Sequence, residues 1–139
     1  MNGINKKDKC GKYGMPPLIY ACRNNNKTLV KMILDHPDID VNIQDNYGNT
    51  AFILACRDNK IKLVKMILEH EHSDIDVNQK DPDGNTALIF ACKNNNKTLV
   101  KMFLDHPDID VNLQDKDRRT PLHIACQNNN IELVKLLFK

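Results

Sequence analysis

The chain repeats one short apolar phrase four times, and each copy ends in Ala-Cys. The copies are Leu18–Cys22, Phe52–Cys56, Leu88–Cys92 and Leu122–Cys126. Their alanines stand at positions 21, 55, 91 and 125, so the intervals are 34, 36 and 34 residues. A fixed period in this range is typical of repeat proteins, in which each unit buries its apolar face against its neighbours. We therefore expect about four stacked units rather than one globular core.

The first half of a repeat is predicted to be a hairpin-like turn followed by a short helix. Residues 45–49 form a turn sequence, in which Gly48 tolerates a positive φ and Asp45 can bond the backbone two residues on. Thr50 follows where a side-chain oxygen can cap a helix. The mostly apolar residues 51–57 supply that helix.

The second half is predicted to be a tight loop, a longer helix and an extended return. Asn59 has an Asn counterpart in every copy, and Asn favours the left-handed conformation that ends helices. Apolar residues at helical spacing predict a helix over 61–68. The links at 35–42 and 105–112 contain Pro, which forbids further helix, and the longer link at 69–78 explains the 36-residue interval.

We therefore expect an all-α solenoid of about four helix-loop-helix repeats with hairpin-like connecting loops, forming a single domain over residues 1–139. The expected repeats are approximately 8–41, 42–77, 78–111 and 112–139.

This order of elements resembles the ankyrin repeat, whose motif reads Asp-x-x-Gly-x-Thr-Pro-Leu-His-x-Ala. Residues 120–125 carry its Thr-Pro-Leu-His-x-Ala part outright, and residues 45–52 and 81–88 carry the motif with substitutions. The tetratricopeptide repeat also has a 34-residue period, but its Trp and Leu-Gly landmarks are missing here, and the chain contains no Trp.

The chain departs from the motif at two kinds of position. The motif His is Ile19, Ile53 and Ile89 in three copies, which removes a hydrogen-bonding side chain. Arg118 replaces the hairpin Gly in the last copy. Because a non-Gly residue in a left-handed conformation costs about 1 kcal/mol, we expect that hairpin tip to be rearranged.

The resemblance implies a protein–protein interaction module that binds a partner protein or peptide on a concave surface formed by loop tips and first helices. Transferred by position, the partner-binding residues are Tyr13, Arg23, Asn46, Tyr47, Asn49, Arg57, Asp83, Asn85, Lys93, Asp117, Arg119 and Gln127. The basic residues among the first-helix positions predict a groove suited to an acidic segment, with Tyr47 as an aromatic anchor. The alternative is an architectural or autoinhibitory segment of a larger multidomain protein.

We do not expect an enzyme, because repeated polar groups form lines rather than convergent sites. Phosphate-loop, Cys-x-x-Cys, His-Glu-x-x-His and Gly-x-Ser-x-Gly motifs are all missing. The links place His beside carboxylates, best at 70–72, where imidazole and carboxylate suit Zn²⁺. The preferred interpretation is that these His side chains bond the last helix carbonyls, so no metal and no cofactor is expected.

Four of the five cysteines occupy equivalent places in successive repeats. Equivalent helices in a stack lie about 8–10 Å apart, beyond the reach of a disulfide. We expect Cys22, Cys56, Cys92 and Cys126 to be free thiols that act as small buried hydrophobes. Cys10 lies outside the pattern.

Composition favours neither nucleic acid nor membrane as a partner. The net charge is +2, with no long block of like charges, and the apolar runs are far shorter than the roughly 20 residues that span a bilayer. The polar first residues do not form a secretory signal, so we expect a cytoplasmic protein, with the nucleus as an open alternative. The last repeat ends without a polar cap, which predicts a fragment of a longer array and head-to-tail self-association through uncapped ends.

Overall fold

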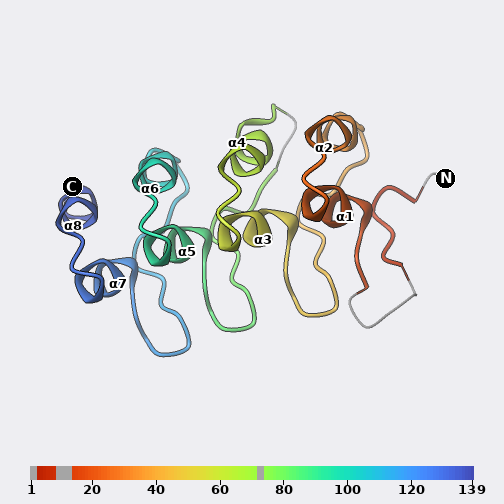
Figure 1. Ribbon diagram of the computed structural model, residues 1–139. Coiled ribbons are helices and arrows are strands. Elements are labelled where there is room, and N and C mark those ends of the chain that lie inside the picture. Colours follow the sequence, from red (N-terminus) through yellow and green to blue (C-terminus); the bar gives the residue numbers. More distant parts are fainter. Residues whose placement is uncertain (1–2, 9–13, 72–73) are drawn as a thin grey trace. The chain divides into compact units, whose positions relative to one another are not determined.

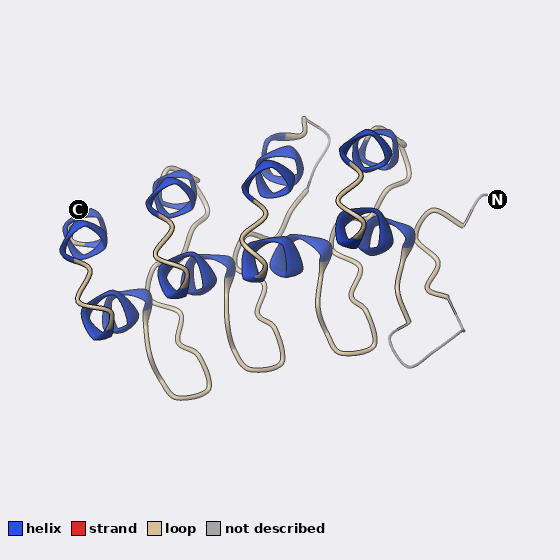
Figure 2. Cartoon of the chain, viewed as in Figure 1, coloured by secondary structure: helices blue, strands red, loops and turns tan. Residues whose placement is uncertain are grey.

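The computed structural model describes residues 3–8, 14–71 and 74–139. This part of the chain contains eight helices and no strand, so the expected all-α class is confirmed (Figure 2). The chain forms two compact units, Met1–Asp76 and Val77–Lys139. Each unit holds two helix pairs, and each pair is one repeat (Figure 1).

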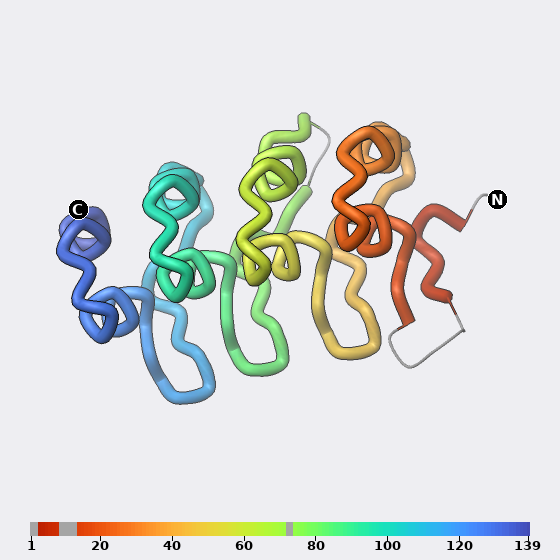
Figure 3. Tube along the Cα trace, in the orientation of Figure 1, coloured from red at the N-terminus to blue at the C-terminus, as the bar shows by residue number. Residues whose placement is uncertain are grey.

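The first unit contains two stacked repeats. Its helices are α1 (Pro17–Arg23), α2 (Lys27–Leu34), α3 (Ala51–Arg57) and α4 (Ile61–Glu69). Within a repeat, α1 contacts α2 and α3 contacts α4. Between the repeats, α1 packs on α3 and α2 on α4, so the short first helices form one row and the second helices another (Figure 3).

The second unit is built in the same way. Its helices are α5 (Ala87–Lys93), α6 (Lys97–Leu104), α7 (Pro121–Gln127) and α8 (Ile131–Leu137). Here α5 packs on α7 and α6 on α8.

The predicted start and end signals of the first helices are present. The Thr50 hydroxyl accepts the Ile53 N–H at 3.2 Å, and Thr86 and Thr120 cap α5 and α7 in the same way. The residues that turn the chain after each first helix are left-handed, with φ between 53° and 57° at Asn25, Asn59, Asn95 and Asn129. Four Asn residues in a conformation that few other side chains tolerate explain why this residue type recurs.

The caps of the second helices were not predicted. The Asn26 carboxamide accepts the Leu29 N–H at 3.0 Å, and Asn96 and Asn130 cap α6 and α8 in the same manner. In α4 the capping position is Lys60, which has no side-chain cap. Its ammonium instead donates to the carbonyl of Cys22 at 3.0 Å and so ties the two repeats of the first unit together.

The first helices and the apolar face of the second helices together form the core. Leu63, Val64 and Ile67 are completely buried in α4, whereas Lys62 and Lys65 are exposed, as the helical spacing predicted. Burying a side chain of this size contributes about 1.5–3 kcal/mol. Because such residues are buried where repeats meet, stacking of neighbouring repeats contributes to the stability of each unit.

Three asparagine side chains each bind the backbone of a link that lies one repeat further along the chain. The Asn42 carboxamide donates to the carbonyl of Asp74 at 2.8 Å and accepts the N–H of Asp76 at 2.9 Å. The same two bonds join Asn5 to residues 38 and 40, and Asn78 to residues 108 and 110. We call this arrangement the asparagine clasp. The clasp could not be predicted from the sequence, because its partner groups are backbone and leave no residue pattern.

One cysteine differs from the prediction. Cys22, Cys56 and Cys92 are buried free thiols, as expected, and burial raises the pKa of Cys22 and of Cys92 to about 12. Cys126 is exposed, so the expectation that it is buried is wrong. It lies on α7, at the position equivalent to Cys22 and Cys92, each of which has a following repeat in its own unit. Cys10 lies outside the described residues.

Candidate partner-binding surface

A buried aspartate holds the first complete hairpin in shape. Asp45 is 6% exposed, and its carboxylate accepts the N–H groups of Tyr47 and Asn49, both at 2.9 Å. The Gly48 N–H donates to the Asp45 carbonyl at 3.1 Å, and Gly48 has a φ of 82°. The loop is therefore rigid at its base and presents its tip residues outward.

The second unit repeats this frame. The Asp81 carboxylate accepts the N–H of Asp83 at 2.9 Å and of Asn85 at 2.8 Å. The Gly84 N–H donates to the Asp81 carbonyl at 3.0 Å.

The last hairpin adds an ion pair to the frame. The Asp115 carboxylate accepts the N–H groups of Asp117 and Arg119, and the Arg119 Nε lies 2.9 Å from it. Burial of Asp115 raises its pKa, but the backbone bonds and the Arg119 guanidinium more than offset this, so its pKa lies below the usual value. The carboxylate therefore stays charged.

Arg118 keeps the hairpin geometry that glycine has elsewhere, so the expected rearrangement of that tip is wrong. Its φ is 64°, and its N–H donates to the Asp115 carbonyl at 2.9 Å. The buried Asp115 frame therefore outweighs the local cost of about 1 kcal/mol for a left-handed Arg.

On the first unit, the nominated residues form two groups. Asn46 and Tyr47 are exposed at the hairpin tip, where the Tyr47 side chain is 43% exposed, and Asn49 is half-buried. Arg23 and Arg57 are exposed at the ends of α1 and α3, which pack on each other.

The two arginines differ in their contacts. Arg57 pairs with the neighbouring Asp58 at 3.2 Å, and both side chains are largely exposed. Arg23 donates to the Met15 sulfur at 3.2 Å. Tyr13, which was also nominated, lies outside the described residues.

On the second unit, most nominated residues contact each other. Asn85 is 6% exposed, and its carboxamide oxygen accepts the Lys93 ammonium at 2.8 Å. Arg119 contacts both Asp117, at 3.5 Å, and Gln127, at 3.4 Å. Of this group Asp83, Asp117 and Gln127 are exposed, whereas Lys93 and Arg119 are half-buried.

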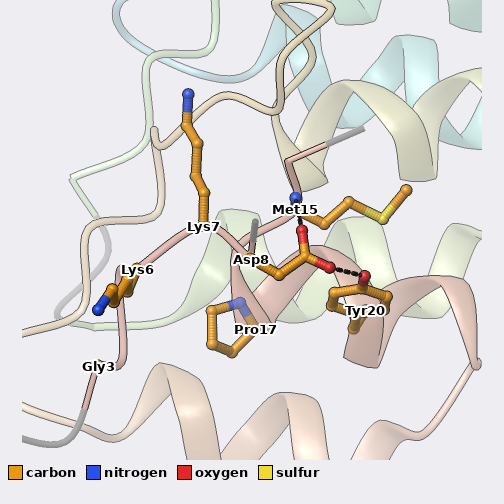
Figure 4. Close-up of a pocket in the computed structure, with 7 residues that line it drawn as sticks. All are labelled: Gly3, Lys6, Lys7, Asp8, Met15, Pro17 and Tyr20. Atoms are coloured by element: carbon orange, nitrogen blue, oxygen red, sulfur yellow. Dashed lines mark hydrogen bonds between the residues drawn. The ribbon is translucent and has the colours of Figure 1, made fainter. Parts of the chain in front are cut away.

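A hollow of about 490 Å³ opens at the start of the first unit, as Figure 4 shows. The carboxylate of Asp8 lies beside it, accepts the Met15 N–H at 2.8 Å and also accepts the Tyr20 hydroxyl. The Tyr20 bond first, and the Met15 bond second, lower the pKa of Asp8. The ammonium groups of Lys6 and Lys7 point in different directions in Figure 4, so this hollow lacks a convergent cation pair.

Tyr20 is a surface residue that lies outside the predicted contact set. The equivalent residues in the other copies are aliphatic or Phe and are buried. That departure from the repeat pattern is the signal that could have found it.

The histidines in the links bond differently from the expectation. The expected partners were the last carbonyls of the preceding helix, but the Nδ1 atom of His36 accepts the Asp38 N–H at 3.0 Å. His70 Nε2 lies 2.8 Å from the Asp35 carboxylate. This bond, followed by that of Lys31, lowers the pKa of Asp35.

Metal-ligating side chains do not gather in the described ranges 3–8, 14–71 and 74–139, where no group of three or more His, Cys, Asp or Glu could hold an ion. His72, part of the strongest metal candidate in the sequence, lies outside these ranges.

None of the helices in the described part of the chain is long and apolar enough to cross a bilayer.

In comparisons with known proteins, a family model described as ankyrin repeats (3 copies) matches residues 1–81 and 71–139. No curated protein matches the sequence.

Proposed function

Because the chain belongs to the ankyrin repeat family, whose members are generally protein–protein interaction modules, we propose that it recognises a partner protein or peptide through its hairpin tips and first helices. Members of this family are typically not catalytic, and the proposed activity is binding alone, without a cofactor. The nominated residues remain the proposed contact set.

The observation that supports this proposal most strongly is the contrast between hairpin frames and hairpin tips. Three aspartates, of which Asp45 and Asp115 are buried and Asp81 is half-buried, make the same backbone bonds in three hairpins. The tip residues between these bonds have no common chemistry: Asn46 and Tyr47 stand in one hairpin, Pro82 and Asp83 in the next. A rigid base with variable exposed residues is the arrangement that recognition loops use.

The surface of the first unit fits an acidic segment. Tyr47 offers a large, exposed amphipathic ring on a braced loop, and Tyr and Arg dominate binding hot spots. The exposed pair of Arg57 with Asp58 is worth about 0–1 kcal/mol, so Arg57 can exchange Asp58 for a partner carboxylate at little cost. Arg23 supplies a second cation on the adjacent first helix.

A displayed library of random peptides tests this proposal with defined ligands. The wild-type chain is expected to enrich peptides rich in Asp and Glu, and Tyr47→Ala combined with Arg57→Ala is expected to lose that enrichment. The matched control is Lys62→Ala combined with Lys65→Ala, which removes two exposed charges from α4 outside the proposed surface. Affinity should fall as salt is raised from about 50 to 500 mM, because exposed charges are screened.

Equal enrichment by the wild type and the Tyr47 and Arg57 double variant would reject the proposed contact residues. If no peptide were enriched, the architectural or autoinhibitory segment would be the better interpretation.

We also propose that the protein acts in the cytoplasm. The free thiols at Cys22, Cys56 and Cys92 support this, because disulfides are rare and thiols stay reduced in that compartment. Fractionation of cells that express the tagged chain checks this proposal.

A further inference from the structure

Each unit contains one internal stacking interface, which defines two faces of a repeat. We call the face that meets the next repeat the forward face, and the face that meets the preceding repeat the rear face. Comparing equivalent residues shows which positions each face buries.

The rear face of the first repeat exposes residues that stacking buries elsewhere. Leu63 of α4 and Leu133 of α8 are completely buried, and each belongs to the second repeat of its unit. Their equivalent in the first repeat, Leu29 of α2, is 39% exposed. On the same helix Met32 is 65% exposed, so α2 presents an uncovered apolar strip.

The forward face of the last repeat shows the complementary pattern. Cys22 and Cys92, which face a following repeat within their units, are buried, whereas the equivalent Cys126 is exposed. Leu34 at the end of α2 is 1% exposed, and its equivalent after α8, Phe138, is 72% exposed. The two exposed faces thus carry the residue types that pack together inside each unit.

A hollow opens between α6 and the end of α8. It has a volume of about 600 Å³, and its apolar lining includes Leu104, Val111, Leu137 and Phe138. Leu34 and Val41, the equivalents of Leu104 and Val111 in the first unit, are buried. The hollow therefore lies at a place where the equivalent residues of the first unit are buried.

A fourth clasp asparagine stands beside this face without a clasp partner. The Asn112 N–H donates to the Asp110 carboxylate at 2.9 Å, which is the local bond that Asn42 makes to Asp40. Asn112 is exposed, and its side chain makes no hydrogen bond within the described part of the chain. In each of the other clasps, the asparagine side chain accepts the backbone N–H of the residue that stands two positions before the next clasp asparagine. Gly3 stands two positions before Asn5, so its N–H is the equivalent donor.

We propose that the chain stacks head to tail on a second copy of itself, with the forward face of α7 and α8 against the rear face of α1 and α2. Phe138 and Leu137 of one copy cover Leu29 and Met32 of the other. Asn112 of the first copy accepts the Gly3 N–H of the second. The net charge of +2 is too small to oppose association strongly. Because the two faces differ, the contact is heterologous, and each added copy brings a further face for stacking.

Two single substitutions and their mixture test this arrangement. Met32→Lys blocks the rear face and Phe138→Lys blocks the forward face, and both side chains are so exposed that the fold should tolerate the change. Sedimentation velocity from about 10 µM to 1 mM covers the range in which weak contacts dissociate. The wild type is expected to form growing species, and each variant alone is expected to associate at least tenfold more weakly.

An equimolar mixture of the two variants should form dimers that grow no further, since each variant retains one intact face. The matched control is Ile131→Lys, which replaces another large exposed apolar residue of the last repeat. Lysine occupies the equivalent positions 27 and 97 and stays exposed there, so this control should associate like the wild type.

Alkylation provides an independent measurement. The Cys126 thiol should react more slowly as the wild-type concentration rises, because stacking covers it, and peptide mapping separates it from the other thiols. A monomeric wild type at 1 mM would overturn the proposal. So would self-association of Met32→Lys at wild-type strength, which indicates a symmetric contact between two forward faces, or a mixture that stays monomeric.

Discussion

Replacing Gly84 with alanine tests whether neighbouring hairpins are held by backbone contact. Gly84 has a φ of 79°, and a Cβ atom there would lie 2.9 Å from the Lys116 nitrogen and 3.0 Å from two backbone atoms of Asp115. The 2.9 Å contact is shorter than real Cβ atoms show, and the two 3.0 Å contacts are unusually tight; backbone cannot rotate out of the way as a side chain can. The Lys116 N–H donates to the Asp83 carbonyl at 2.9 Å, so moving it weakens that bond as well.

The expected cost combines three terms. A left-handed alanine costs about 1–2 kcal/mol. Weakening the bond between Lys116 and Asp83 adds about 1 kcal/mol. The stiffer unfolded chain returns about 0.4–1 kcal/mol. The net destabilisation of Gly84→Ala is therefore about 2 kcal/mol.

Urea unfolding followed by circular dichroism measures this cost, and the chain supplies its own control. Arg118 is left-handed at the equivalent position, with a φ of 64°, and already carries a Cβ. Arg118→Ala therefore changes neither the backbone preference nor the crowding, and its cost should stay within about 0.5 kcal/mol, as for an ordinary surface substitution. If Gly84→Ala also cost less than 0.5 kcal/mol, the contact between the hairpins would not be the constraint inferred here.

Three further predictions concern stability. Leu63→Ala removes a completely buried side chain and should cost about 2–5 kcal/mol by urea unfolding, whereas a cost below 1 kcal/mol would mean that the α2–α4 interface repacks freely. Thr86→Ala removes the cap of α5 and should cost about 1 kcal/mol, with Thr86→Ser close to wild type in the same measurement. Arg119→Met removes an ion pair that lowers the pKa of Asp115, so this pKa should rise. The stability that comes from the lowered pKa is fully present above the pKa of about 4 in the unfolded chain, and it is lost as pH falls through the pKa in the folded chain. The difference in urea midpoint between Arg119→Met and wild type should therefore be largest near pH 7 and shrink below pH 4, and a difference independent of pH would exclude the ion pair as its cause.

The sequence predicts the repeat well because the signals that define it are local. Gly48 and Asn59 tolerate a left-handed backbone, Thr50 caps a helix start, and the aliphatic spacing over residues 61–68 defines one helix face. All of these features are found in the structure. The same reasoning could not find the asparagine clasp, because Asn42 binds backbone atoms in another repeat and the partners carry no residue signature.

Two predictions were wrong for the same physical reason: residues at equivalent positions of the repeats can have different surroundings in the structure. Cys126 repeats Cys92 in sequence, but the face that buries Cys92 is uncovered at Cys126. The prediction for Arg118 used only the cost of a left-handed backbone at a non-Gly residue. In the structure, the Asp115 carboxylate and its ion pair with Arg119 hold the hairpin in that conformation. In a repeat protein, the neighbours of a residue outweigh its propensity.

The candidate surface shows the same dependence on surroundings, and this predicts different contributions to binding from the two units. Lys93 cannot turn to a partner without leaving the carboxamide oxygen of Asn85, a 6% exposed residue, and an unsatisfied buried acceptor costs about 1–3 kcal/mol. Breaking the pair of Arg57 with Asp58 carries no such cost, because Asp58 is exposed and water can replace the guanidinium there. The two cations occupy equivalent positions in their repeats, yet only Arg57 can exchange its partner cheaply. An acidic ligand should therefore lose more affinity when Arg57 is replaced by alanine than when Lys93 is, although the sequence alone gives them the same role.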